Sequence, residues 1–201
     1  MPVIVDYFVT MISPWTFVGH RRFAEMAAVA GAEIRMKPLH IGKLFEATGG
    51  TPAAKRSPQR KAYRFQEMAR WKRRFGLDDW NIDPPHFPVS DITANRMVIA
   101  QGQRGGDTLV LAEAFMRGVW VEDRDISDEP TLQEIADAAG FNGTALLQAS
   151  SRDAVKADLR ANTSEAIERG VFGCPSYVIG DEVFWGQDRL EFVQQALEES
   201  S

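Results

Sequence analysis

Residues 3–39 read VIVDYFVTMISPWTFVGHRRFAEMAAVAGAEIRMKPL and carry the pattern strand, helix, strand. The opening apolar and β-branched run, residues 3–9, predicts a buried strand. Ser13 followed by Pro14 is typical of a helix start, with the serine as the cap, and apolar residues then recur at helical spacing. Residues 33–39 alternate between polar and apolar and predict a second strand. This order predicts a βαβ unit whose two strands run parallel.

The end of the chain carries the pattern strand, strand, helix. Residues 176–179 and 182–185 predict two short strands joined by a tight turn. Residues 187–198 follow with apolar side chains along one face, which predicts a closing amphipathic helix. We expect this ββα unit and the βαβ unit at the start of the chain to contribute their strands to one sheet.

The middle of the chain, residues 45–165, predicts mostly helices. The helical candidates, the last of which runs on past this segment, are residues 59–75, 93–101, 108–120, 131–139 and 143–169. Thr131 and Glu134 form a capping box, which predicts the start of the fourth of them. We therefore expect an α/β fold in which a large all-helical insertion separates a βαβ half from a ββα half.

The composition is that of an ordinary soluble globular protein: 201 residues, 44% hydrophobic and 25% charged. The single cysteine, Cys174, excludes an internal disulfide and a multi-cysteine zinc site. The three histidines lie at no metal-ligand spacing, so we expect no metal. The start of the chain carries neither an export signal nor a run long enough to span a bilayer, which predicts a cytoplasmic protein.

Charge is distributed unevenly along the chain. The formal net charge is −5, yet residues 55–75 hold nine Lys and Arg side chains and one acid, a local net charge of +8. One basic surface on an acidic protein favours a small anionic ligand over a polyanion. We therefore expect a small-molecule partner, with no nucleic acid and no membrane.

Two motifs carry the chemistry. Ser13-Pro14-Trp15-Thr16 lies between the first strand and the first helix, where the thioredoxin fold carries its Cys-x-x-Cys. Ser13 and Thr16 stand at the two cysteine positions, so redox cycling through a protein dithiol is excluded. Gly173-Cys174-Pro175-Ser176 precedes the third strand, where thioredoxin-like proteins place a cis-proline opposite the active-site helix. We expect the two motifs to face one another.

These motifs, in their order along the chain, resemble one family. SPWTF at residues 13–17, GVFGCPSYVIGDEVFWGQDRL at 170–190 and the pairing of VWVE at 119–122 with DISD at 125–128 resemble the 2-hydroxychromene-2-carboxylate isomerases. These enzymes group with kappa-class glutathione transferases in the DsbA-like branch of the thioredoxin superfamily. The resemblance implies a thioredoxin-like fold, with residues 1–44 and 166–201 as the thioredoxin-like domain and 45–165 as the helical insertion domain.

The resemblance implies glutathione as the cofactor, with Ser13 as the catalytic residue that activates its sulfur. A helix N-terminus beside a hydroxyl donor stabilises a thiolate, which lowers the pKa of a thiol bound there. The implied contacts to glutathione come from Ser13, Thr51, Arg60, Cys174, Pro175, Gln187 and Asp188. In that set Asp188 and Gln187 hold the γ-glutamyl end, and Arg60 holds the glycyl or the substrate carboxylate. The alternative for Arg60 is a solvated helix face, and for Asp188 a helix cap.

An aromatic substrate needs an apolar wall. We expect Trp15, Tyr63, His86 and Phe87 to line the substrate pocket, with Phe45, Trp71 and Trp80 as further candidates that are equally consistent with core packing. Cys174 also leaves two interpretations open. Its thiol is either a small apolar filler or lies near the glutathione sulfur, where oxidation would form a mixed disulfide.

The resemblance implies a glutathione-dependent, homodimeric isomerase of aromatic compound degradation. It would interconvert 2-hydroxychromene-2-carboxylate and trans-o-hydroxybenzylidenepyruvate, an aromatic carboxylate substrate, by reversible thiolate addition. The main alternative is a kappa-like glutathione transferase or peroxidase that acts on electrophiles through the same site. A non-catalytic glutathione- or peptide-binding module and a disulfide oxidoreductase are weaker alternatives, because Ser13, Arg60 and Asp188 occur together and the Cys-x-x-Cys is missing.

Overall fold

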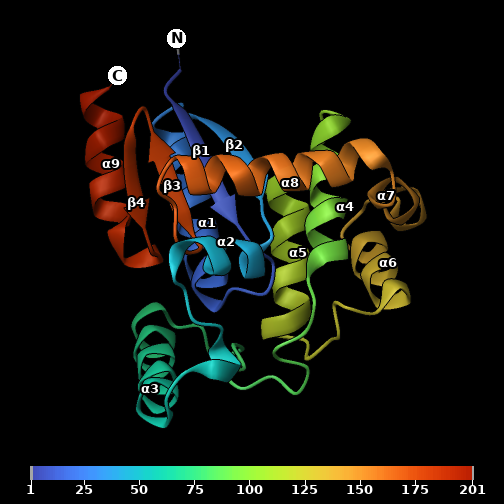
Figure 1. Cartoon of the computed structure of the whole chain (residues 1–201), viewed down its shortest axis with the longest axis horizontal. Helices are drawn as coiled ribbons and strands as arrows, with labels where there is room; N and C mark the ends of the chain where they lie inside the picture. The colour runs from blue at the N-terminus through green and yellow to red at the C-terminus, as the bar shows by residue number, and fades with distance from the viewer. Residues whose placement is uncertain (1, 201) are drawn as a thin grey trace.

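The computed structural model describes residues 2–200 and contains a four-stranded sheet with the strand order β2-β1-β3-β4 (Figure 1). The strands are β1 (Ile4–Val9), β2 (Glu33–Pro38), β3 (Ser176–Ile179) and β4 (Glu182–Trp185). β1 and β2 run parallel, while β3 lies antiparallel to both β1 and β4. Met1 and Ser201, the outer ends of the predicted thioredoxin-like domain, lie outside the described residues.

The helices follow the predicted order. They are α1 (Pro14–Val29), α2 (Ile41–Thr48), η1 (Ala53–Lys55), α3 (Pro58–Phe75), α4 (Ile92–Gln103), α5 (Thr108–Trp120), α6 (Glu129–Ala138), α7 (Gly143–Ser150), α8 (Asp153–Glu168), η2 (Gln187–Arg189) and α9 (Leu190–Glu199). Helices α2 to α8 separate the βαβ half from the ββα half, which confirms the predicted fold class. The domain limits at residues 44–45 and 165–166 stay a prediction. Within residues 2–200, no helix combines the length and the apolar character needed to cross a membrane.

The sheet has a core on each face, as the alternation of β1 side chains requires. Val5, Tyr7 and Val9 belong to a large core that is shared with α1, α4, α5 and α9. Phe8 points the other way, into a smaller cluster that includes Ala166 of α8. Helix α3 lies at the lower edge of Figure 1, and its one buried residue, Met68, belongs to the large core, against which Trp71 and Phe75 of the same helix pack.

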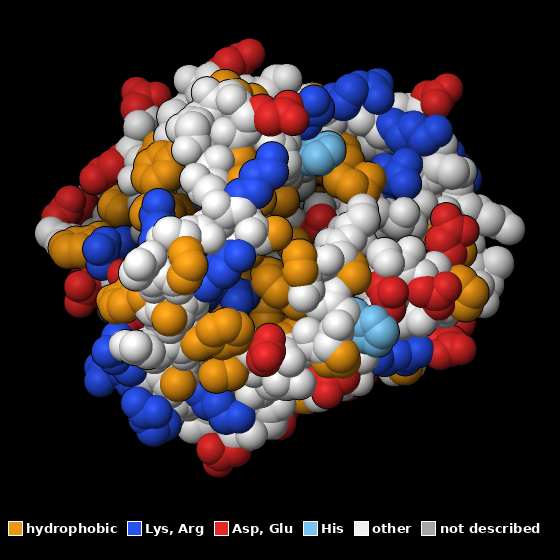
Figure 2. Space-filling view, turned by 60° about the horizontal axis from the view of Figure 1, so that its bottom comes forward, with side chains coloured by type: hydrophobic (Ala, Val, Ile, Leu, Met, Phe, Trp, Pro, Cys, Tyr) orange, Lys and Arg blue, Asp and Glu red, His pale blue; other side chains and the backbone are white. Residues whose placement is uncertain are grey.

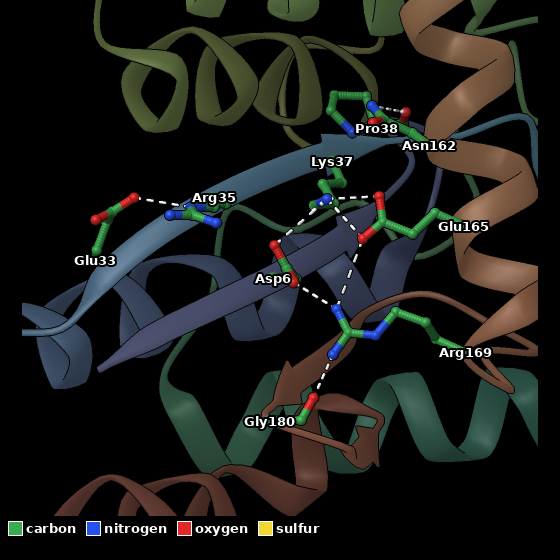
Figure 3. Close-up of polar contacts among 9 residues, drawn as sticks. All are labelled: Asp6, Glu33, Arg35, Lys37, Pro38, Asn162, Glu165, Arg169 and Gly180. Carbon is green, nitrogen blue, oxygen red and sulfur yellow. Dashed lines mark hydrogen bonds and ion pairs between the residues drawn. The ribbon is translucent and has the colours of Figure 1, made fainter. Parts of the chain in front are cut away.

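A network of charged side chains ties α8 to the sheet (Figure 3). Lys37 of β2 places its Nζ 2.6 Å from Glu165 Oε2 and 3.5 Å from Asp6 Oδ1. Arg169, which caps the end of α8, pairs with Asp6 of β1 and donates to the Gly180 carbonyl in the β3–β4 turn. The network therefore joins the last helix of the insertion to β1, β2 and the turn between β3 and β4.

The helix that contains Thr131 starts before that residue, so the predicted capping box is wrong. Asp128 is the cap, because its Oδ2 accepts the Thr131 N–H at 2.9 Å and the Thr131 hydroxyl at 2.7 Å. Glu134 pairs with Arg124 instead of reaching back to the helix start. An aspartate upstream competes directly for the N–H groups that a capping threonine would serve.

Other helix limits also differ from the prediction. The helix expected over residues 143–169 is two helices, α7 and α8, because Arg152 between them has an extended backbone with ψ 144°. Ser151 donates its hydroxyl to the Gln148 carbonyl at 2.8 Å, one of the local side-chain bonds that compete with a helical ladder. The closing helix begins with the 3-10 turn η2 and becomes α-helical at Leu190. Helix α2, with Gly42 in its first turn, was not predicted as a separate element.

Candidate active site

A cavity of about 670 Å³ opens beside the carboxyl end of β1. Its wall is built from parts of residues 10–15, 40–53, 56–64, 87–92 and 172–174, together with Trp185. Figure 2 turns this end of the molecule forward and shows hydrophobic and Lys or Arg side chains gathered around a hollow. A cavity of this volume with a mostly apolar wall and a few polar groups is the usual size for a small-molecule site.

Ser13 lies at the centre of this wall, as the N-cap of α1. Its Oγ accepts the Thr16 N–H at 3.2 Å and donates to the Cys174 carbonyl oxygen at 3.1 Å. The two motifs therefore face one another as predicted, although 161 positions separate Ser13 from Cys174. The predicted cis peptide between Cys174 and Pro175 is present, and a second one joins Phe87 to Pro88. A hydroxyl at the positive end of a helix is suited to a ligand atom that carries negative charge.

The turn that leads to Ser13 is held in place by the start of α4. Asp91 Oδ2 accepts the Ile12 N–H at 3.1 Å and the hydroxyl of Thr10. Asn95 accepts the Met11 N–H at 3.1 Å. Burial raises the pKa of Asp91, which is 4% exposed. Asp91 was not among the predicted site residues, and its only signal in the sequence is an acid in an otherwise uncharged stretch before a helix.

Cys174 lies at the cavity wall but behaves as a packing residue. It is 7% exposed and belongs to the apolar cluster that contains Phe8 and Leu39. Burial, with a smaller contribution from the charge of Asp91, raises the pKa of the Cys174 thiol well above its ordinary value. Since the thiolate is the reactive form, this environment favours the apolar-filler interpretation over the mixed disulfide.

Three arginines line the cavity: Arg56 before α3, and Arg60 and Arg64 on its first two turns. Arg56 donates its Nε to the Thr51 carbonyl at 3.0 Å, so it braces the loop that contains Thr51. Burial lowers the pKa of Arg64 to about 10 and also lowers that of Arg56, and both stay cationic near neutral pH. Thr51 and Arg60 were predicted site residues, whereas Arg56 and Arg64 were missed although all three arginines recur every four residues.

Aromatic side chains supply the apolar part of the wall. The predicted Trp15 and Phe87 and the candidate Phe45 line the cavity, whereas Trp80 is fully buried in the core. Trp71 stacks on Phe75, away from the cavity wall. An exposed pair at the rim was missed: the rings of Phe172 and Trp185 lie 4.7 Å apart.

Five predicted site residues lie outside the lining of this cavity. They are Tyr63, His86, Pro175, Gln187 and Asp188. Tyr63 lines an adjoining pocket of about 380 Å³ between Trp15 and one face of α3, a face that includes Arg60. His86 is exposed, with its Nδ1 3.9 Å from Asp125 Oδ2.

The last three of these lie just past the cavity wall. Pro175 is buried behind Cys174. Gln187 is buried as well, and its Oε1 accepts from Arg22 Nη1 at 3.1 Å. Asp188 is exposed and pairs with Arg189 at 3.0 Å. Gln187 and Asp188 follow Trp185 of the cavity rim in the sequence, but neither lines the cavity.

Comparison with known proteins gives consistent matches along nearly the whole chain. A model of the DSBA-like thioredoxin domain family matches residues 4–198. A 2-hydroxychromene-2-carboxylate isomerase of Sphingobium xenophagum is 27% identical over 98% of this chain and 99% of its own length. Glutathione S-transferase kappa 1 of Rattus norvegicus is 24% identical over 98% of this chain and 92% of its own. The solved structure of a 2-hydroxychromene-2-carboxylate isomerase, 24% identical, superposes with a TM-score of 0.81 over 98% of this chain and 95% of that one.

Proposed function

The chain belongs to the DSBA-like thioredoxin domain family, and we propose that it is a glutathione-dependent isomerase. The proposed reaction interconverts 2-hydroxychromene-2-carboxylate and trans-o-hydroxybenzylidenepyruvate. One observation carries the proposal: Ser13, at the N-terminus of α1, faces the Cys174 carbonyl in a cavity that three arginines and several aromatic rings line. The full-length isomerase relatives support the same reaction.

The cavity fits glutathione as the cofactor. Its volume of about 670 Å³ lies within the range of small-molecule sites, and it offers a helix N-terminus for a sulfur and guanidinium groups for carboxylates. Arg64 Nη2 is buried without a hydrogen-bond partner among residues 2–200, so the wall has spare donor capacity. When bound, glutathione supplies a thiolate that adds reversibly to a conjugated carbon–carbon double bond, which lets that bond rotate.

The proposed role of Ser13 follows from its two hydrogen bonds. The Thr16 N–H fixes the position of the oxygen, so only the hydroxyl hydrogen changes direction, from the Cys174 carbonyl to a ligand sulfur bound in the cavity. A donor held this way stabilises the charged form of the thiol, and the helix N-terminus acts in the same direction. The backbone of Cys174, before Pro175, is then available to an extended ligand.

The remaining contacts are assigned on family resemblance and on position. Arg60 and Thr51, both at the cavity, hold the glycyl carboxylate end. Gln187 and Asp188, beyond Trp185 on the rim, hold the γ-glutamyl end. Asp188 would exchange its exposed partner Arg189 for the ligand ammonium.

The aromatic ring of the substrate lies against Trp15 and Phe87, with Tyr63 and His86 at the outer margin. Neither of the last two forms part of the main wall, so their proposed contacts depend on a substrate that reaches past α3 or the 84–88 loop. We further propose that the protein works as a homodimer in the cytoplasm, as the family resemblance implies.

A kappa-like glutathione transferase is the second candidate, supported by the match to the rat kappa enzyme. The decisive assay follows the absorbance of 2-hydroxychromene-2-carboxylate with substoichiometric glutathione while free thiol is monitored. Isomerisation with unchanged thiol supports the isomerase. Loss of thiol with a general electrophile, without isomerisation, supports the transferase. Glutathione binding without either reaction supports a non-catalytic binding module.

A further inference from the structure

Arg64 lines the cavity, and none of the ion pairs among the described residues joins it to a carboxylate. Its Nη2 is buried and has no hydrogen-bond partner within residues 2–200. Arg70, two turns further along α3, pairs with Glu67, and Arg124 and Arg169 pair with acids elsewhere. Removing part of a cation from water without a partner is unfavourable, so a half-buried guanidinium with one unsatisfied nitrogen in a cavity wall indicates an anion site.

Aromatic rings hold the Arg64 guanidinium in place. Its carbon Cζ lies 4.6 Å from the centre of the Phe87 ring and 5.9 Å from that of Trp120. Rings at these distances attract a cation but leave the in-plane N–H groups of the guanidinium free to donate. Phe87 also lines the cavity, so the cation and an apolar ring face lie side by side at the same wall.

Neighbouring acids do not neutralise the positive charge of Arg64. Asp83 attracts the guanidinium, but the effects of burial and of repulsion by Arg56 on its pKa are larger. Asp91 is the one acid among the described residues that line the cavity, and Thr10 and Ile12 already donate to its Oδ2. The cavity therefore has an excess of positive charge, which a bound anion would balance.

The three arginines of the cavity wall differ in their surroundings. Arg56 is engaged with the Thr51 carbonyl, and Arg60 is exposed. Arg64 is the one that combines partial burial with an adjacent aromatic face. A planar, aromatic carboxylate satisfies both features at once, because its ring packs on Phe87 while its carboxylate accepts from Arg64.

We propose that Arg64 is the specificity-determining residue that binds the carboxylate of a planar, conjugated aromatic acid. This inference rests on the proposed function, since it assigns the substrate end of the same site and leaves Arg60 to glutathione. It follows that the site accepts such acids and discriminates against their neutral esters.

The test measures binding and needs no turnover. Isothermal titration calorimetry compares trans-2-hydroxycinnamate with its methyl ester on the full chain saturated with S-methylglutathione, which occupies the glutathione site without a nucleophilic thiol. We expect the wild type to favour the acid by roughly 10- to 100-fold, the range for hydrogen bonds to charged groups. R64Q should bind both compounds equally. R70Q, on the same helix but paired with Glu67 outside the cavity, should keep the preference.

Two results would overturn the assignment: equal binding of acid and ester by the wild type, or an unchanged preference in R64Q. If circular dichroism shows that R64Q is misfolded, R64M serves in its place, because its unbranched apolar side chain keeps contact with Phe87. The proposed isomerase activity is tested separately, by the absorbance assay described above. If acid binding requires Arg64 but the protein does not isomerise the substrate, the Arg64 proposal is supported and the proposed isomerase function is contradicted.

Discussion

Replacement of Ser13 by alanine tests the centre of the proposed site. The substitution removes the cap of α1, in which Ser13 Oγ accepts the Thr16 N–H, and the bond to the Cys174 carbonyl. Loss of a helix cap costs about 0.5–2 kcal/mol. Loss of a neutral hydrogen bond costs about 0.5–1.5 kcal/mol. The free energy of unfolding should therefore fall by about 1–3.5 kcal/mol, and urea denaturation measures it.

The effect on the bound thiol is separate from the effect on stability. A hydrogen bond to a charged group contributes about 1.5–3 kcal/mol, and about 1.4 kcal/mol corresponds to one pKa unit. The pKa of glutathione bound to S13A should accordingly lie about 1–2 units higher than in the wild type. Ultraviolet absorbance of the thiolate in a pH titration measures this pKa. Turnover near neutral pH should fall roughly tenfold or more, because less thiolate is present.

Ser57→Ala is the matched control. Ser57 also precedes a proline and caps a helix, accepting the Arg60 N–H at 3.4 Å, but it does not line the cavity. S57A should lose stability of the order of 1 kcal/mol or less and keep the thiol pKa of the wild type. The reasoning about Ser13 is refuted if S13A and S57A retain the same turnover, or if the thiol pKa in S13A is unchanged.

Three further predictions address the surroundings of the site. Cys174 should gain no mass when the folded protein is treated with glutathione disulfide near neutral pH, and should react once the chain is unfolded in denaturant; one added glutathione on the native protein contradicts the packing role. Burial raises the pKa of Asp91, so the folded state binds the proton of its carboxyl group more tightly than the unfolded chain does. The contribution of Asp91 to the free energy of unfolding should therefore fall as pH rises above its unfolded pKa of about 4. The pH profile of the wild type minus that of D91N isolates this contribution, and a difference that rises with pH opposes it. D188N should weaken glutathione by roughly 2- to 5-fold, as expected for an exposed ion pair, but leave cysteinylglycine unaffected; equal weakening of both ligands argues against the γ-glutamyl contact.

The sequence predicted the elements that rest on local signals. The β-branched run of β1 and the Ser13-Pro14 helix start determine their own conformations, because strand propensity and capping act over a few residues. The order of strands and helices then leaves few topologies that pair β1 with β3. The proximity of Ser13 and Cys174 was predictable for the same reason. In this fold the segment after the first strand lies opposite the segment before the third strand, and the two motifs occupy these segments.

The misses arise where contacts decide between local signals of similar strength. Asp128 and Thr131 are both good caps, and only the hydrogen bonds show that the aspartate is used. The sequence does not reveal the partners of Asp91, since Thr10 and Ile12 lie some eighty residues away. The positions of Gln187 and Asp188 relative to the cavity depend in the same way on packing, with Gln187 turned toward Arg22.

The basic segment shows what a sequence and a structure contribute together. Composition marks residues 55–75 as an excess of charge but cannot tell a solvated helix face from a ligand site. The structure divides them by their partners: Arg70 pairs with Glu67, whereas Arg64 lies over Phe87 with a buried nitrogen that no described residue satisfies. Helix α3 contacts the large core through Met68, Trp71 and Phe75, and this packing accounts for those three positions but not for Arg64. An anion in the cavity is what accounts for an arginine held in this way, and the preference for acid over ester measures that anion directly.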